Sequence, residues 1–381
     1  MQKRVLLIRN AQAYDFGGGE RFPVFVARVI QQEYGVPIII SRSPSLLRFA
    51  SSKDIKTIRG LWWSNQNWSG VRVLLFPIYL LWQVVLFFWY LAMFVRIKPQ
   101  AIHIQSKDDF IAATFAGKIV GAVVIWTDHA DLKHIWRNLL VWYKNPIGKL
   151  VYLAGCLADT ITIISKSEYQ AVTQHLPKES LVRNKLKIIN NGSPDVKNQY
   201  PATKSNTFTF CSTNRLVTDK GINEMITAFK RFHKKHPHSE LVLVGNGPEE
   251  DHFKALARDE PSIVFTGFQS DPLSFVAASD VLLQPTYHEG FSISILESFM
   301  MEKPVIATSV GGNVEMVQDN ETGLLIPAKN SDSLCEAMER LYGDSKLRSR
   351  LARNARAQYE KKFVFDVIVK KEFIPLYETI R

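Results

Sequence analysis

KLKIINNGSPDVKNQYPATKSNTFTFCSTN, residues 185–214, contains the break that organises the rest of the chain. An apolar run ends in KLKIINNG, a polar stretch with two prolines follows, and a second apolar run begins at TFTFCSTN. Proline and clustered polar residues between two such runs are typical of a linker between domains. With 381 residues, the chain is also long for a single hydrophobic core. We therefore predict two domains, joined by a linker over residues 193–206.

Short apolar runs separated by segments of helix length occur on both sides of this break. Near-continuous apolar strands that alternate with helices predict a parallel sheet buried on both faces. The predicted strands of the first domain are 4–10, 36–41, 71–76, 101–106, 123–129, 159–165 and 185–192, and those of the second are 207–214, 240–245, 262–267, 280–285, 304–310 and 323–327. The expected fold class is α/β, with two doubly wound, Rossmann-like domains in tandem and a ligand site in the cleft between them.

Charge and tryptophan are concentrated in the first half of the chain. Residues 1–200 contain 25 Lys and Arg against 12 Asp and Glu, and all eight tryptophans lie between Trp62 and Trp142. A basic, Trp-rich half favours an anionic, interfacial partner such as a membrane surface. A nucleic-acid partner is disfavoured, because the sequence shows no zinc-finger spacing, aromatic RNA-binding signature or helix-turn-helix. A basic solvated face without a partner is the plainer alternative.

The cysteines and the first residues favour a cytoplasmic protein. The three cysteines are far apart in the sequence and show no metal-ligand spacing, which fits unpaired thiols in a reducing compartment. The start MQKRVLLIRN has too short an apolar run for a signal peptide and reads as a first strand.

Glycine-rich turns follow several predicted strands. In FGGGE, residues 16–20, Gly17 and Gly18 would let the backbone approach an anion at a helix start. The loop does not match Gly-x-Gly-x-x-Gly, which disfavours an NAD(P) oxidoreductase. Weaker signals are GNGPEE (245–250), which could be a plain turn with proline at the helix start, and GFQSDP (267–272), whose backbone groups could contact the edge of a base.

Charged residues at strand ends suggest a site for a diphosphate. Arg215 and Lys220 lie in STNRLVTDKG, on the loop that follows the first strand of the second domain. Arginine can donate two parallel hydrogen bonds to phosphate oxygens, and lysine adds a compact positive charge. The alternative is that both are ordinary surface side chains without a ligand. His129 in TDHADLKH also follows a strand and is a candidate polar contact to substrate, whereas a lone histidine is more often structural.

HEGFSISILE, residues 288–297, resembles the Glu-x7-Glu signature of retaining nucleotide-sugar glycosyltransferases of glycosyltransferase family 4, which have the GT-B fold. Further stretches resemble the family's motifs in the same order along nearly the whole chain. These are FGGGE, AIHIQS, WTDHADL, NRLVTDKGIN, GNGPEE, GGNVEMV and TGLLIPAKN. Each motif alone is weak, but the ordered set at matching spacing is specific.

The resemblance implies a role for each candidate residue. Arg215 and Lys220 would neutralise the donor diphosphate, Glu289 would contact the donor sugar, and Glu297 would hold the ribose hydroxyls as a bidentate acceptor. His129 would lie beside the reacting sugar. The other implied donor contacts are Gly17, Gly18, Gly245, Asn246, Gly267, Phe268, Gly290, Phe291 and Ser292.

The resemblance also implies a domain layout and a metal-free reaction. Residues 1–192 would form the acceptor-side domain, 207–362 the nucleotide-sugar domain, and 363–381 a C-terminal helix returning to the first domain. Three positions depart from the family's pattern, namely Asn214, Val314 and Gln105, which leaves sugar and acceptor preference open. No isolated Asp-x-Asp follows a predicted strand, so we expect no metal ion and no cofactor besides the nucleotide-diphosphate sugar as co-substrate.

Residues 73–95, VLLFPIYLLWQVVLFFWYLAMFV, contain no charged side chain over 23 positions, which is long enough to span a bilayer. A spanning segment would cut the first sheet in two, because predicted strands lie on both sides of it. We therefore expect a strand over 71–76 and then a helix that is apolar all round and inserts its outer face into a membrane surface. Burial by a partner subunit would account for the helix equally well.

These observations predict a retaining hexosyl- or glycosyltransferase that acts on a membrane-associated or lipid-linked glycan acceptor in envelope polysaccharide or glycolipid synthesis. Its expected location is the cytoplasm, peripherally bound to the inner face of the plasma membrane. One alternative is a soluble glycosyltransferase acting on a small sugar acceptor. The other is a non-catalytic GT-B scaffold subunit of a membrane glycan complex.

Overall fold

The computed structural model describes residues 3–10, 18–61, 75–141, 145–201 and 206–378. The chain divides into two compact units, one formed by residues 1–190 with 366–381 and the other by residues 191–365. The described part of the expected linker packs on the second unit, because Ser193 pairs with Val364 and Lys197 forms an ion pair with Glu302.

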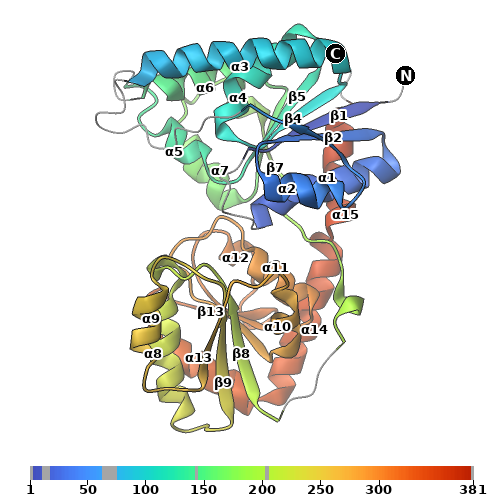
Figure 1. The fold of residues 1–381 in the computed structure, drawn as a ribbon. Helices are drawn as coiled ribbons and strands as arrows, with labels where there is room; N and C mark the ends of the chain where they lie inside the picture. The colour runs from blue at the N-terminus through green and yellow to red at the C-terminus, as the bar shows by residue number, and fades with distance from the viewer. Residues whose placement is uncertain (1–2, 11–17, 62–74, 142–144, 202–205, 379–381) are drawn as a thin grey trace. The chain divides into compact units, whose positions relative to one another are not determined.

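The described residues of the first unit form a seven-stranded parallel sheet in the order β3-β2-β1-β4-β5-β6-β7 (Figure 1). Its strands are β1 (Arg4–Ile8), β2 (Val36–Ser41), β3 (Lys56–Arg59), β4 (Ala101–Ile104), β5 (Val123–Asp128), β6 (Thr160–Ile163) and β7 (Leu186–Ile188). The residues of the central strands are almost all buried, as expected for a sheet covered on both faces.

Helices cover both faces of this sheet. The α-helices before the C-terminal segment are α1 (Gly18–Glu33), α2 (Pro44–Ser51), α3 (Phe76–Ile97), α4 (Phe110–Ile119), α5 (Leu132–Trp136), α6 (Pro146–Leu157) and α7 (Lys166–Thr173). In Figure 1, α1 and α2 lie on one side of the sheet, and α3, α4 and α6 lie on the other. Helix α4 packs against both α3 and α6.

The predicted strand 71–76 needs correction at its end. Residues 71–74 lie outside the described residues, and Phe76 is the first residue of α3. The edge strand that the sequence did not predict is β3, in which Lys56 and Arg59 are exposed and the two residues between them are half-buried. A polar edge strand carries no apolar run, and for that reason its sequence gave no strand signal.

The C-terminal segment returns to the first unit. It consists of α15 (Phe365–Ile368), a π-helical turn η6 (Val369–Phe373) and α16 (Ile374–Tyr377). The Tyr377 hydroxyl lies 2.8 Å from Nδ1 of His103 on β4, and Lys3 forms an ion pair with Glu378. The segment is therefore bound to the sheet by a buried contact as well as by surface charge.

The second unit contains a six-stranded parallel sheet in the order β10-β9-β8-β11-β12-β13. The strands are β8 (Phe208–Thr213), β9 (Ser239–Val244), β10 (Ile263–Gly267), β11 (Val281–Gln284), β12 (Val305–Thr308) and β13 (Gly323–Ile326). The helices are α8 (Ile222–His233), α9 (Glu250–Leu256), α10 (Leu273–Ala278), α11 (Ile293–Met300), α12 (Asn313–Met316), α13 (Ser331–Gly343) and α14 (Ser345–Lys362). Two doubly wound α/β units confirm the predicted fold class.

In both sheets the strand order reverses beside the first strand of the unit. The reversal lies between β1 and β4 in the first sheet and between β8 and β11 in the second. Loops on either side of such a reversal run in opposite directions and leave a crevice at the carboxyl ends of the strands. The predicted site residues Arg215, Lys220 and Glu289 lie on the loops that follow β8 and β11.

Candidate functional site

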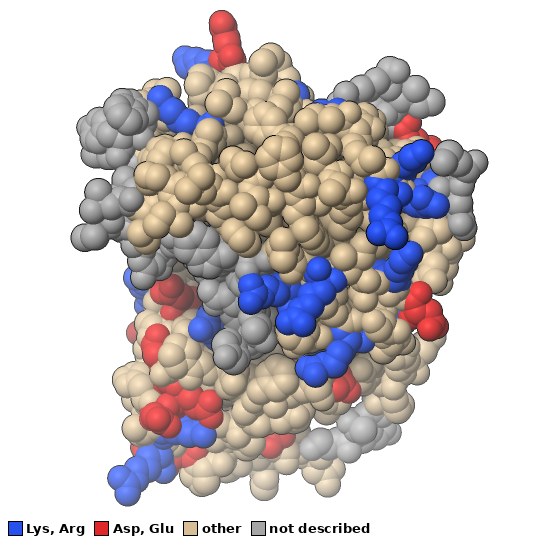
Figure 2. Space-filling view, turned by 45° about the horizontal axis from the view of Figure 1, so that its top comes forward, with Lys and Arg blue, Asp and Glu red and all other residues tan. Residues whose placement is uncertain are grey.

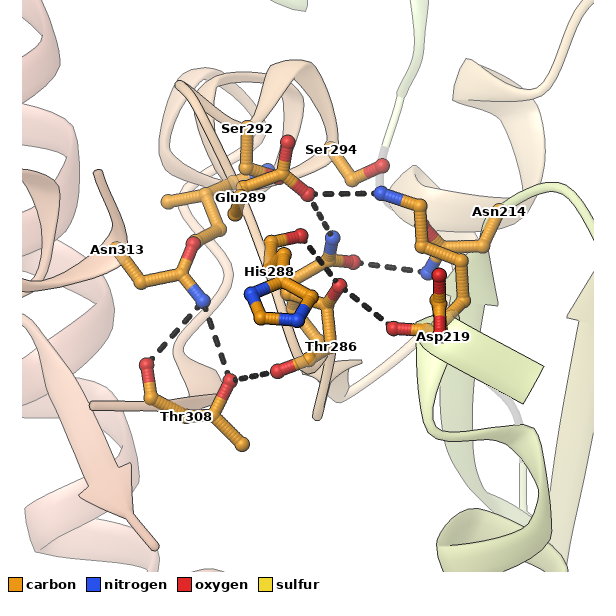
Figure 3. A network of polar contacts seen from close by, with 12 residues as sticks. Asn214, Asp219, Thr286, His288, Glu289, Ser292, Ser294, Thr308 and Asn313 are labelled. Atoms are coloured by element: carbon orange, nitrogen blue, oxygen red, sulfur yellow. Dashed lines mark hydrogen bonds and ion pairs between the residues drawn. The ribbon is translucent and has the colours of Figure 1, made fainter. Parts of the chain in front are cut away.

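A chain of polar contacts joins the loops after β8 and β11 (Figure 3). Lys220 Nζ donates to Oε2 of Glu289 at 2.9 Å, and Gln284 Nε2 donates to the same oxygen at 3.1 Å. Asn214 Nδ2 in turn donates to Oε1 of Gln284 at 2.8 Å. The two residues that the sequence placed in separate motifs, Lys220 and Glu289, therefore form an ion pair at the switch point of the second sheet.

Arg215 lies on the same loop as Lys220 and is exposed. Its guanidinium makes no hydrogen bond or ion pair with another side chain in the described parts of the chain. The loop is fixed by its backbone, since the Leu216 amide donates to Asn246 O at 2.9 Å. Arg215 is thus a cation on an anchored loop.

The start of α11 is held against the end of β8. Ser294 Oγ donates to the carbonyl of Thr213 at 2.7 Å and lies 2.9 Å from its hydroxyl. Ser292 is buried and caps α11 by accepting from the Ile295 amide at 3.3 Å. Phe291 is also buried and packs edge-on against Phe363. The positive end of the α11 dipole therefore lies beside the β8 loop that carries Arg215 and Lys220.

Two glycines set the position of Glu289 and Gly290. The Gly312 amide donates to Glu289 O at 2.8 Å. A Cβ on Gly311 would lie 2.0 Å from Glu289 O, and one on Gly312 would lie 2.1 Å from Gly290 O. Only glycine permits this approach, so the Gly-Gly segment holds the backbone at Glu289 and Gly290.

The turns after β9 and β10 lie next along the same edge of the sheet. Gly245 has φ of 135° and donates its amide to Gly267 O at 3.0 Å. A Cβ on Gly245 would lie 2.1 Å from Asn214 O, so this glycine is needed for close backbone packing. Asn246 and Phe268 are exposed at this edge. The side chains of the two turns are therefore accessible, whereas Gly245 itself packs on the β8 loop.

Glu297 lies inside α11 and is half-buried. Burial, followed by the charge of Glu297, raises the pKa of the Cys211 thiol to about 12. The carboxylate of Glu297 is therefore near Cys211 on β8, on the side of α11 that faces the sheet.

In the first unit, His129 follows β5. Its ring packs edge-on against Phe22 of α1, with centroids 5.1 Å apart. Burial, followed by the charges of Arg9 and His103, lowers the pKa of His129 well below 6.5. Its Nε2 atom is buried without a hydrogen-bond partner among the described residues. The lowered pKa favours the neutral imidazole of His129.

The glycine loop of the first unit is only partly described. Gly17 lies outside the described residues, and Gly18 is the first residue of α1. Candidate residues are described at the carboxyl edge of the first sheet and, separately, at the carboxyl edge of the second.

Two further polar side chains at the edge of the first sheet were missed as candidates for ligand contact. Gln105 follows β4, and both its amide atoms are buried without partners in the described structure. Asp128 ends β5, where Oδ1 accepts from the Asp131 amide at 2.7 Å while Oδ2 is buried without a partner there. Because Ile104 pairs with Trp126 in neighbouring strands, Gln105 and Asp128 lie at the same edge. Folded proteins rarely leave buried polar atoms unpaired, so this edge is suited to a polar ligand.

Within the described ranges, no group of three or more His, Cys, Asp or Glu side chains could share a metal ion. The cations on the loop that follows β8 are Arg215 and Lys220.

Comparisons with known proteins bear on the family of the chain. Residues 195–358 match the family model described as glycosyl transferases group 1. An uncharacterized glycosyltransferase of Methanocaldococcus jannaschii, MJ1607, is 30% identical over 283 residues, which cover 65% of this chain and 72% of that protein. The chain belongs to the group 1 glycosyltransferases.

A second relative of this glycosyltransferase chain is named for its role in polysaccharide synthesis. The capsular polysaccharide biosynthesis glycosyltransferase CapM of Staphylococcus aureus is 29% identical over 242 residues. The match covers 59% of this chain and 62% of CapM. Anabaena Alr3699/HepE, crystallised with UDP and glucose, has the same fold, with a TM-score of 0.73, 19% identity and coverage of 98% of this chain and 99% of that chain.

Asn214 and Gln284 were not predicted to take part in the site of this glycosyltransferase. Both are polar residues at the carboxyl ends of β8 and β11, which are neighbours in the sheet. The sequence feature that could have identified them is a polar residue at the end of an apolar strand, as Gln284 is in VLLQ. Their contacts connect the β8 loop to Glu289, so they orient the Lys220–Glu289 pair.

The pH dependence of stability is expected to change when Asp128 is replaced by asparagine. Burial, followed by the charge of Asp131, raises the pKa of Asp128 from 3.8 to about 7. The folded state therefore binds a proton that the unfolded state has lost, and the free energy of unfolding falls as the pH rises from about 4 to about 7. Asparagine keeps the carbonyl oxygen that accepts from Asp131 and Leu132 but has no proton to lose.

Thermal unfolding followed across this pH range measures the effect. The melting temperature of Asp128→Asn is expected to rise relative to the parent glycosyltransferase chain as the pH increases. The control is Asp54→Asn, which is exposed in the same unit and should keep a constant difference. A constant difference for Asp128→Asn as well would show that its carboxyl titrates normally.

Proposed function

We propose that the chain is a retaining glycosyltransferase that moves a sugar from a nucleotide-diphosphate donor to a hydroxyl group of a membrane-associated or lipid-linked glycan. The observation that carries the proposal is the Lys220–Glu289 ion pair at the β8–β11 switch point, with Arg215 and the start of α11 beside it. Two cations and a helix N-terminus provide the charge that a leaving diphosphate requires.

Donor binding would change the partners of Lys220 and Glu289. Lys220 neutralises Glu289 at 2.9 Å. A diphosphate that draws the ammonium of Lys220 to its own oxygens releases the Glu289 carboxylate to accept hydrogen bonds from sugar hydroxyls. Gln284 keeps the carboxylate in place through its bond to Oε2. In the proposed reaction, the bond between the sugar's anomeric carbon and the diphosphate breaks, a bond to the acceptor oxygen forms, and the acceptor hydroxyl passes its proton to the leaving diphosphate.

Binding of the nucleoside is assigned to the neighbouring part of the same edge. Glu297, near β8, would accept from both ribose hydroxyls. The turns with Asn246 and Phe268 would contact the base from the ends of β9 and β10. The bound UDP and glucose of HepE, which shares the fold, support a nucleotide sugar as the donor class.

The acceptor is assigned to the edge of the first sheet. The unpaired Nε2 of His129, the amide of Gln105 and Oδ2 of Asp128 are a donor and acceptor set suited to sugar hydroxyls. Since His129 is neutral, its Nε2 can accept from, or donate to, a hydroxyl group without a change in charge. The role of CapM in capsular polysaccharide synthesis supports an envelope glycan as the acceptor class. A peripheral location at the inner face of the plasma membrane and a reaction without a metal ion complete the proposal.

Transfer of radiolabelled sugar tests this function. The purified chain is incubated with a panel of nucleotide sugars, a membrane lipid extract and a chelator of divalent metals. Label in the lipid phase, together with release of nucleoside diphosphate, is expected for one donor. Label only on soluble sugars would favour a soluble acceptor. If no panel member is bound or turned over, the chain is a scaffold and the proposal is wrong.

Glu297→Gln is expected to weaken donor binding by about tenfold to a hundredfold, because one of two hydrogen bonds to the ribose is lost and the other no longer has a charged acceptor. Isothermal titration with the donor identified above measures the dissociation constant. Glu336→Gln, on the exposed face of α13, is the matched control and should bind as the parent does. Equal affinities for both variants would remove Glu297 from the donor site.

A further inference from the structure

Helix α3 presents an entirely apolar stripe to the outside of the first unit. The exposed positions follow helical spacing, and Leu81 and Phe88 remain 68% and 61% exposed. The stripe consists of Ile78, Leu81, Val85, Phe88, Ala92 and Val95. A water-facing side of a helix normally carries polar side chains, so this face is built for an apolar environment.

The buried side of α3 is the more polar side. Tyr90 donates to Oδ1 of Asp109 at 2.8 Å, and Gln83 donates to the carbonyl of Asp108 at 3.0 Å. Tyr79 is buried on the same stripe. The usual distribution of a surface helix is therefore inverted, with hydrogen-bonding groups facing the protein and hydrocarbon facing outward.

Positive charge lies at the end of this apolar stripe. Arg96 and Lys98 are exposed at the C-terminal end of α3, and α3 contains no acidic residue. The neighbouring helix α4 adds the exposed side chains of Phe115 and Ile119. In Figure 2, which turns the top of Figure 1 forward, a broad tan surface is bordered on one side by Lys and Arg side chains. An apolar surface edged with cations is complementary to an anionic bilayer, where acyl chains lie beneath negative headgroups.

We propose that α3 lies in the plane of an anionic lipid bilayer with its outward stripe inserted among the acyl chains. The stripe from Ile78 to Val95 is about 25 Å long. The half-buried Trp82 and Trp89 lie between this stripe and the buried side, where an interfacial tryptophan is stabilised. The proposal rests on the surface of the first unit and is independent of the proposed transfer reaction.

Helix α3 is also the one helix in the described ranges that is long and apolar enough to cross a membrane. Crossing would transfer Tyr90, Gln83 and their partners into hydrocarbon and remove α3 from a core that includes Leu86 and Phe94. It would also separate β3 from β4, which belong to one sheet. The buried contacts therefore favour a helix that lies on the membrane.

Flotation with lipid vesicles tests the proposal on the complete chain. The parent protein is expected to float with phosphatidylcholine vesicles that contain phosphatidylglycerol, and less with phosphatidylcholine alone. Leu81→Glu combined with Phe88→Glu should lower the bound fraction at least about tenfold, since two inserted apolar side chains are lost. The matched control is Leu181→Glu, an equally exposed leucine of the same unit, which should bind vesicles as the parent does.

A second variant tests the charge. Arg96→Gln with Lys98→Asn should weaken binding to the anionic vesicles about tenfold and leave the melting temperature unchanged, since asparagine tolerates the left-handed backbone at position 98. The proposal is overturned if the parent fails to float, or if the double glutamate variant floats as well as the parent. The stripe could instead bind a second copy of the chain. The proposal is also overturned if light scattering shows a dimer that the double glutamate variant dissociates, while the parent does not bind vesicles.

Discussion

Lys220→Ala is expected to lower the rate of sugar transfer by about a hundred- to a thousandfold, the cost of removing one preorganised charge from a transition state. In the proposed complex Lys220 has moved from Glu289, its partner at 2.9 Å, to the diphosphate, so the variant deprives the leaving group of a cation. Initial rates of nucleoside diphosphate release, measured with saturating donor and acceptor, give the change in kcat.

Arg215→Ala should act in the same direction, and the double variant should lose less than the product of the two single losses, because both cations contact one diphosphate. Lys230→Ala is the matched control, since this lysine lies in the last turn of α8 and pairs with Asp259. If Lys220→Ala retains the parental kcat, the diphosphate does not bind at the switch point of the second sheet.

Gly311→Ala is expected to destabilise the second unit by about 2–4 kcal/mol, the range typical of backbone clashes and strained φ angles. Gly311 has φ of 47°, and an added Cβ would lie 2.0 Å from the carbonyl oxygen of Glu289. The backbone at Glu289 has to move away, so donor binding should weaken together with stability. Thermal unfolding and donor titration on the same sample measure both effects.

Gly343→Ala provides the control for this substitution. It ends α13 with no atom within 4 Å of an added Cβ, so stability should change by less than about 0.5 kcal/mol. A Gly311→Ala variant that melts and binds donor like Gly343→Ala would show that the Gly-Gly segment does not position Glu289.

The doubly wound architecture was predictable because strands of a parallel sheet are buried on both faces and therefore appear in the sequence as continuous apolar runs. β2 agrees with its prediction residue for residue, and the strands of the second unit lie within one or two residues of theirs. β3 was not predictable, since Lys56-Thr57-Ile58-Arg59 has one aliphatic residue and becomes a strand only through pairing with β2. The start of α3 was misplaced because the apolar run continues through Leu75 and Phe76 without a change in composition.

The candidate site was partly predictable for a geometric reason. Residues that follow parallel strands meet at one edge of the sheet, which is how Lys220 and Glu289 come together although 69 residues separate them. The contacts made through Asn214 and Gln284 could not be predicted, because they depend on which strands are neighbours. The same limit applies to Gly245, whose close approach to Asn214 O is a tertiary contact between backbones.

Hydrogen–deuterium exchange of the complete chain, with and without the nucleotide sugar that supports transfer, tests the central claim most directly. The account predicts that donor slows amide exchange in residues 213–221 and 288–297, the two loops that the Lys220–Glu289 pair joins. Protection confined to other segments, or no protection by any nucleotide sugar, would contradict it.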